Sequence, residues 1–159
     1  MKYIIRPIGN VQVQGELYTI RIEKGCFPGL RHLEGFSHLW IVWWAHLSDQ
    51  TETRNRLTAK NLFRNAPTET GVFASRTPER PNPIMISTIK LESVDAENGI
   101  ITTTFIDAED GSPVLDIKPY FPMERIRNCH TPVYYRHWPQ WAEDAGSFNW
   151  KDEISLGNI

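Results

Sequence analysis

The sequence predicts a mainly β protein, a small closed or nearly closed β-barrel with short helical segments and an aromatic C-terminal tail. Three observations predict it: short apolar segments alternate with polar residues, turn residues separate these segments at regular intervals, and helical periodicity is nearly absent. This pattern is typical of all-β barrels and sandwiches. A chain of 159 residues suits one domain, so we expect residues 1–159 to form a single barrel domain.

The first half of the chain contains three predicted strands. Alternation over residues 11–22, interrupted by Gly15, predicts two short strands joined by a turn. Proline and glycines within residues 26–35 predict a helical turn, which leads into a buried strand over the apolar residues 36–47. Residues 49–65 lose the alternation, which predicts a long solvated loop.

The middle of the chain combines an irregular loop with a hairpin. Residues 71–74 predict a brief strand, and the prolines that follow each remove a backbone donor, so residues 75–83 should be ordered but irregular. The pair Asn98-Gly99 tolerates positive φ and lies between apolar segments, which predicts a hairpin over residues 84–106.

The last part of the chain begins with a turn and ends with aromatic residues. Residues 110–113 predict the turn and residues 114–117 a strand. Six aromatic side chains lie between residues 134 and 150. We expect this tail to wrap around the barrel.

Composition and charge exclude several classes of protein. The formal net charge of −2 gives no global positive field, so any contact with nucleic acid must come from a local patch. Cys26 and Cys129 lie outside metal-ligand spacing, which predicts reduced thiols in a cytoplasmic protein without a structural metal. No export signal is visible, and the longest apolar run, residues 39–47, is about half of a membrane-spanning helix. Common hydrolase and nucleotide-binding motifs are absent.

The densest polar segment is residues 75–83, where prolines fix the backbone in advance of any ligand. Arg76 and Arg80 could recognise carboxylates or phosphates, and Asn82 offers both a donor and an acceptor. These features are typical of a recognition loop. The alternative is that both arginines pair with surface acids such as Glu79.

Two further segments carry polar groups next to apolar ones. Asp116 and Lys118 should share one face of their strand, either as part of a site or as an isolated ion pair on the barrel rim. Residues 33–46 place His46 in a tryptophan-rich strand. Such residues are usually core, although the aromatic surface could stack an adenine ring.

These segments together resemble a known family. Residues 71–84 are similar to the G-V-F-A-T-R-S-P-x-R-P-N-P-I signature of the TrmO (TsaA-like) family. Residues 33–40 are similar to its L-x-x-F-S-H-L-W segment, and residues 110–120 to its D-G-T-P-V-x-D-I-K-P-Y segment. All three motifs occur in the family's order.

The resemblance implies a dimeric β-barrel that binds S-adenosylmethionine near the subunit boundary and methylates N6 of threonylcarbamoyl-adenosine beside the tRNA anticodon. By motif position, the residues implied to bind the cofactor are Ala45, His46, Arg76, Ser87, Asp116, Ile117, Lys118 and Pro119. Asp116, Arg76 and Asn82 are the implied catalytic residues, and Arg80 and Lys118 the implied substrate ligands. No metal is implied.

The chain also departs from the family pattern. No P-R-Q-P-G-like segment lies within residues 9–27, and Met85 replaces the glycine usual after P-N-P-I. We also expect the chain to lack the extra C-terminal domain of longer bacterial enzymes. Two alternatives therefore stay open, a methyltransferase acting on a small molecule and a non-catalytic module that binds S-adenosylmethionine or a nucleotide.

Overall fold

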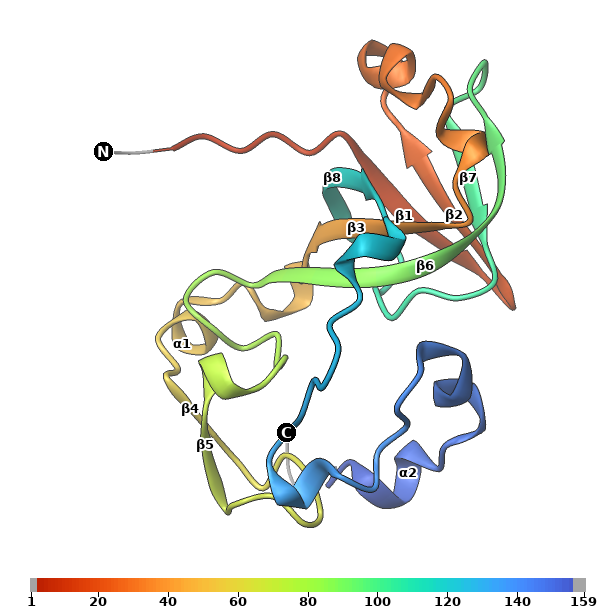
Figure 1. Ribbon diagram of the computed structural model, residues 1–159. Helices are drawn as coiled ribbons and strands as arrows, with labels where there is room; N and C mark the ends of the chain where they lie inside the picture. The colour runs from red at the N-terminus through yellow and green to blue at the C-terminus, as the bar shows by residue number, and fades with distance from the viewer. Residues whose placement is uncertain (1–2, 156–159) are drawn as a thin grey trace.

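A computed structural model describes residues 3–155 and contains the predicted closed barrel (Figure 1). Each strand is antiparallel to its neighbours. In order around the barrel the strands are β1 (Gly9–Gln14), β2 (Leu17–Ile22), β7 (Ile100–Thr103), β6 (Ile84–Asp95), β3 (His38–Trp44) and β8 (Pro113–Pro119). The predicted β1–β2 and β6–β7 hairpins are confirmed.

Strand β3 pairs along its length with both β6 and β8. Its side chains alternate strictly: Leu39, Ile41 and Trp43 are buried in the barrel, whereas the even-numbered positions 38–44 are only half-buried. The predicted buried strand is therefore shorter than residues 36–47, and only one of its faces lies in the core.

The core fills the barrel and is closed at one end by two short 3-10 helices. These are η1 (Lys24–Leu30) and η2 (Leu33–Gly35), in the segment where a helical turn was expected. They bury Leu30 and Leu33 against the strands. The largest fully buried side chains inside the barrel are Val11, Ile20, Leu39, Ile41, Ile89, Ile101 and Val114.

The expectation of one long loop over residues 49–65 is wrong. After η3 (His46–Ser48), this segment forms α1 (Thr51–Arg54) and β4 (Thr58–Lys60), and β4 pairs with β5 (Glu69–Gly71) in a separate two-stranded ribbon. One face of the ribbon is exposed, and the other carries Ala59 and the buried Thr70. With three residues in each strand, the ribbon is too short for an alternation to be recognised in the sequence. The brief strand expected at residues 71–74 also ends early, because Val72–Ala74 is the 3-10 helix η4.

The aromatic tail packs on the β4–β5 connection, so the expectation that it wraps around the barrel is wrong (Figure 1). Its elements are η5 (Pro122–Glu124), η6 (Val133–Tyr135), η7 (Ala142–Ser147) and α2 (Trp150–Glu153). Phe63 lies between Tyr135 and Trp138, with ring centroids 5.6 and 4.9 Å away. Backbone bonds from Arg64 N to Glu153 O and from Ser155 N to Leu62 O complete the contact.

Glu153 is the polar centre of this contact. The side chain is only 5% exposed, and its carboxylate accepts 2.9 Å hydrogen bonds from Trp138 Nε1 and His137 Nε2. Burial alone would raise the pKa of Glu153, but these hydrogen bonds and the positive charges of His137 and Arg64 hold it below its ordinary value. The ionised carboxylate therefore helps to hold the tail in place.

Over residues 3–155, none of the helices has the length and apolar character needed to cross a membrane. The same described residues include no group of three or more His, Cys, Asp or Glu side chains placed to hold a metal ion.

Acid should loosen the tail. A carboxyl group whose pKa is lowered by folding contributes stability above its unfolded pKa, and this contribution is lost as the pH falls through the folded value. As the pH falls below about 4.3, the ordinary pKa of a glutamate, we expect tryptophan fluorescence to report solvation of Trp138 and Trp150 before the barrel unfolds. Glu153→Gln should remove this early transition, and an early transition of unchanged size in that variant would contradict the assignment.

Gly99→Ala should destabilise the protein by about 1–3 kcal/mol. Gly99 has φ +68°, and a Cβ there would lie 2.0 Å from the Phe27 ring. Urea unfolding measures the change. Gly29→Ala is the matched control because a Cβ at Gly29 has no neighbour within 4 Å; equal effects of the two substitutions would refute this explanation.

Candidate functional site

The three motif segments meet around β3. At the end of this strand, Ala45 N donates to Pro83 O at 2.8 Å, which ties the strand to the proline-rich loop. The next residue, His46, has its Nδ1 3.3 Å from Ser112 Oγ in the turn before β8. Along its other edge β3 pairs with β8, with Val42 opposite Asp116. Segments far apart in sequence thus reach one end of the barrel.

Arg80 holds the proline-rich loop in shape. Its Nε donates to Thr77 O at 2.7 Å, and its Nη2 donates to Val72 O and Ser75 O at 2.7 and 2.6 Å. The sequence predicts substrate binding by Arg80, but these contacts favour a positioning role. Three carbonyl groups of an irregular loop are satisfied by one guanidinium.

The loop leaves Arg76 exposed. Glu79 pairs with Arg56 from the segment before β4, so the alternative in which Glu79 neutralises Arg76 or Arg80 is not what the structure shows. Among the described residues, Arg76 has neither an ion pair nor a side-chain hydrogen bond. Its guanidinium is available to an anionic group.

Asp116 and Lys118 form an ion pair on the outer face of β8, with 2.7 Å between Oδ2 and Nζ. Both side chains are about half-exposed. They stand opposite Val42 and Trp40 on β3. Ile117 and Pro119 alternate with them along β8, and both line a cavity of about 390 Å³ beneath η1 and η2, to which Asp116 also contributes.

Ser87 lies inside the barrel. Its Oγ accepts a 2.8 Å hydrogen bond from Trp43 Nε1 and donates to Asp107. Ile41 separates Ser87 from Ile117 across β3, on the inward face. Within one chain, Ser87 and Asp116 therefore do not share a surface, and the contacts of Ser87 favour a role in holding Trp43.

A cavity of about 590 Å³ lies at the end of β3, beside the loop. It is lined by Trp44, Arg54, Asn82 and Leu115, together with residues of the N-terminal arm. Leu115 directly precedes Asp116, and Asn82 belongs to the signature loop. This cavity therefore touches two of the motif segments, residues 71–84 and 110–120, and the end of β3.

Trp44, Asp49 and Arg54 form a network at the cavity that sequence reasoning missed. Trp44 Nε1 donates to Asp49 Oδ2 at 3.0 Å, and Arg54 Nη1 donates to Asp49 Oδ1 at 3.1 Å. The Arg54 guanidinium lies 5.6 Å from the Trp44 ring centroid and also donates through Nε to Pro81 O. Five-residue spacing from Trp44 to Asp49 and Arg54 is the only signal in the sequence, and no regular element predicts it.

Comparison with known proteins shows which sequences this chain is similar to. The family described as tRNA-methyltransferase O N-terminal domain matches residues 6–124. The chain is 41% identical over 144 residues to the tRNA (adenine(37)-N6)-methyltransferase of Escherichia coli, which covers 89% of this chain and 60% of that protein. It is 33% identical over 135 residues to a probable S-adenosyl-L-methionine-binding protein of Methanothermobacter thermautotrophicus, covering 76% and 92% of the two chains.

Solved structures give the same relationship. A crystal structure of TrmO superimposes with a TM-score of 0.65 and 26% identity over 84% of this chain and 64% of that one. TrmO from Pseudomonas aeruginosa gives a TM-score of 0.63 and 26% identity, covering 84% and 63%. The chain spans about three fifths of the Escherichia coli relative. Since the family match includes all three motif segments around β3, the chain belongs to the TrmO family.

Proposed function

We propose that this protein transfers the methyl group of S-adenosylmethionine to N6 of a tRNA adenosine, threonylcarbamoyl-adenosine beside the anticodon. The observation that carries the proposal is that β3 joins the proline-rich loop, which contains the exposed Arg76 and lines the Trp44 cavity through Asn82, to strand β8 with its Asp116–Lys118 ion pair. Relatives at 41% identity bear the name tRNA (adenine(37)-N6)-methyltransferase. That name and this geometry support the same reaction.

The residues at and beside the Trp44 cavity fit S-adenosylmethionine chemically. The cavity volume of about 590 Å³ lies within the range of small-molecule sites. In the cavity, Trp44 offers an aromatic face for adenine. Outside its lining, the exposed Arg76 of the adjoining loop offers a fork for the methionine carboxylate, and Asp116, next to the lining residue Leu115, offers an anion for cationic or hydroxyl groups. Bound there, S-adenosylmethionine supplies an electrophilic methyl group on a sulfonium centre.

The other residues that were predicted to bind the cofactor support the site by holding its strands in place. Ala45 and His46 fix the end of β3 against the loop and the β8 turn. Ile117 and Pro119 hold β8 in the barrel wall. In this proposal Ser87 and Arg80 support the site through Trp43 and through the loop carbonyls, and neither side chain needs to touch a ligand.

Asp116 is the proposed proton acceptor. An exocyclic adenine nitrogen is a poor nucleophile because its lone pair is delocalised, so removal of its proton during attack lowers the barrier. Lys118 orients the Asp116 carboxylate through their 2.7 Å contact and can also face an anionic part of the substrate. Arg76 and Asn82 hold the reactants, since alignment alone is worth up to ~7–11 kcal/mol.

The proposal includes a homodimer. Ile86 on the outer face of β6 is 53% exposed, and Tyr3, Ile4 and Ile5 in the extended N-terminal arm are 80%, 80% and 56% exposed. Apolar surface of this kind favours coverage by another protein chain. A second copy placed there would also enclose the Trp44 cavity, which the arm borders. Light scattering of the purified protein would give the mass of two chains.

A second candidate function is binding of S-adenosylmethionine without methyl transfer. It is favoured by the Methanothermobacter relative, since the chain spans 92% of a protein named only for binding this compound. Binding measured by calorimetry together with no tritium incorporation into total tRNA would support this candidate over the enzyme.

Asp116→Asn should lower the rate of methyl transfer to tRNA by about 100-fold or more, because it removes the proton acceptor. Tritiated S-adenosylmethionine and total tRNA from cells lacking the protein provide the assay. Glu97→Gln is the control, since it neutralises an exposed acid in the β6–β7 turn. An Asp116→Asn variant as fast as Glu97→Gln would exclude Asp116 as the base.

Trp44→Ala should weaken S-adenosylmethionine binding by about three- to tenfold, because it removes one aromatic contact with the ligand. Trp44→Phe should retain most of the affinity because the ring persists while the hydrogen bond to Asp49 is lost. Isothermal titration calorimetry measures both. Unchanged affinity in Trp44→Ala would move the adenine site away from this cavity.

A further inference from the structure

The tail contains a hollow for which the family match gives no function. Its volume is about 810 Å³, and Arg125, Arg127, Asn128, Gln140 and Trp141 are among the residues that line it. The family match ends at residue 124. Most of the hollow therefore belongs to a segment outside the matched domain.

The segment around the hollow is basic although the whole chain carries a net charge of −2. Between residues 120 and 140 there are three arginines and one acid, Glu124, whereas Lys118 pairs with Asp116 and the acids Glu143 and Asp144 follow Trp141. The Glu124 carboxylate is engaged, since it accepts a 2.7 Å hydrogen bond from Phe121 N. Among the described residues, Arg127 and Arg136 have no ion pair or side-chain hydrogen bond. This part of the surface is available to anions.

Trp141 differs from the other tryptophans of the tail. Trp138 and Trp150 pack against each other, with ring centroids 5.2 Å apart. Trp141 is 64% exposed and faces the hollow. An exposed indole in the same hollow as two arginines is a combination with which proteins bind single-stranded nucleic acid, because any base can stack on the ring while arginines contact phosphates.

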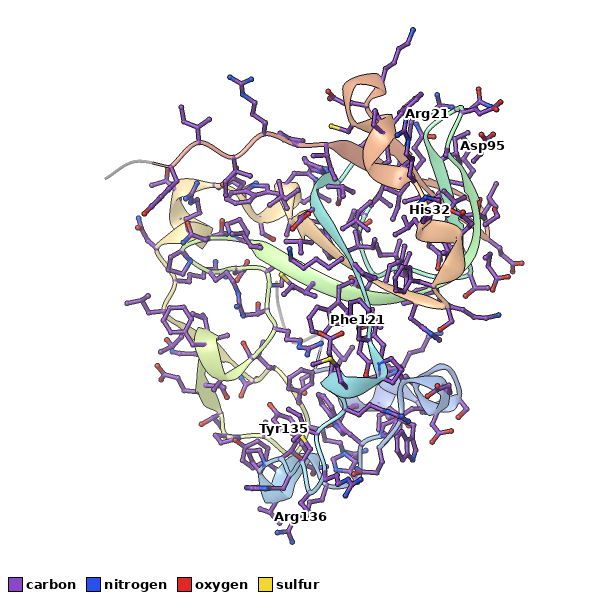
Figure 2. All side chains as sticks on the ribbon, turned by 45° about the horizontal axis from the view of Figure 1, so that its top comes forward. Arg21, His32, Asp95, Phe121, Tyr135 and Arg136 are labelled. Atoms are coloured by element: carbon purple, nitrogen blue, oxygen red, sulfur yellow. The ribbon has the colours of Figure 1, made fainter. Side chains whose placement is uncertain are left out.

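Contacts of the tail with the rest of the protein fix the position of the hollow relative to the proposed site. The chain enters the tail directly after Lys118, and edge contacts of Tyr120 with Trp40 and of Phe121 with Phe36 hold the first residues on the barrel. At its far end the tail is fixed to Phe63. Figure 2 shows Phe121 next to the barrel, and Tyr135 and Arg136 on the side of the tail that is away from the barrel. The tail is thus anchored at both ends.

We propose that this hollow binds the RNA substrate, with an unpaired base on Trp141 and neighbouring phosphates on Arg125 and Arg127. The inference rests on the proposed function and identifies the surface that receives its tRNA. The occupant is RNA, because the lining combines cationic forks, an exposed ring and the amides of Asn128 and Gln140. It also explains how a chain with net negative charge could hold a polyanion, through one local patch.

The test is binding of fluorophore-labelled total tRNA to the full chain, without S-adenosylmethionine, followed by anisotropy. Trp141→Ala and the double variant Arg125→Ala/Arg127→Ala should each bind about tenfold more weakly. For the double variant, the slope of log affinity against log salt should fall by about 1.4–1.8. Trp141→Phe should bind nearly as well as the unchanged protein.

Arg21→Ala is the matched control, since Arg21 is exposed on β2, on the other side of the molecule from Arg136 (Figure 2). It should retain full tRNA binding, and all variants should keep the same affinity for S-adenosylmethionine. Variants of Trp141 and of the two arginines that bind tRNA as well as Arg21→Ala would overturn the inference, as would a protein that does not bind tRNA. Weakened tRNA binding in a protein that transfers no methyl group would support the hollow while refuting the proposed function.

Discussion

The double pairing of β3, with β6 on one edge and β8 on the other, determines where every motif of this chain lies. The strand has only seven residues, yet its register fixes which side chains enter the core. A slip by one residue would exchange the buried Leu39, Ile41 and Trp43 for the residues between them, so the apolar core strongly specifies the pairing. The same register sets Asp116 opposite Val42 and brings Pro83 to Ala45.

The polar residues of the signature loop divide into two groups. Arg80 and Glu79 are engaged within the protein, with loop carbonyls and with Arg56. Arg76 and Asn82 remain exposed, and Asn82 Oδ1 accepts a 3.5 Å hydrogen bond from Arg54 Nη2. A rigid loop that presents a few exposed polar groups loses little entropy when a ligand binds. The engaged residues therefore explain why the exposed ones have a defined position, as a binding site requires.

Much of the barrel could be predicted from the sequence because its signals are local. Asn98-Gly99, flanked by alternating apolar and polar residues, predicts the β6–β7 hairpin, and Gly15 predicts the β1–β2 turn. The β4–β5 ribbon could not be predicted, since each strand has only three residues and one buried or half-buried position at its centre gives no periodic signal. The position of the tail could not be predicted either. Its aromatic composition indicates that the side chains are buried but does not identify the residue they pack against, which is Phe63.

The candidate site was only partly predictable for a similar reason. Motif positions identified the loop and the Asp116–Lys118 pair, but simple alternation from the buried Val114 would place Asp116 inside the barrel. A bulge opposite Val42 and Trp43 shifts the register by one residue and turns Asp116 outward. Ser87 remains inward and so lies on the other face. The Trp44, Asp49 and Arg54 network depends on a fold of the chain between β3 and β4 that no periodic pattern reveals.

The central claim is that the end of β3, the signature loop and strand β8 form one site, and mapping of backbone amide shifts by NMR during titration with S-adenosylmethionine tests it most directly. The account predicts that the largest shifts fall together on residues 44–46, 75–83 and 115–118, which are distant in sequence. Shifts confined to β2 and β7 on the other side of the barrel, or no shifts at saturating concentration, would contradict it.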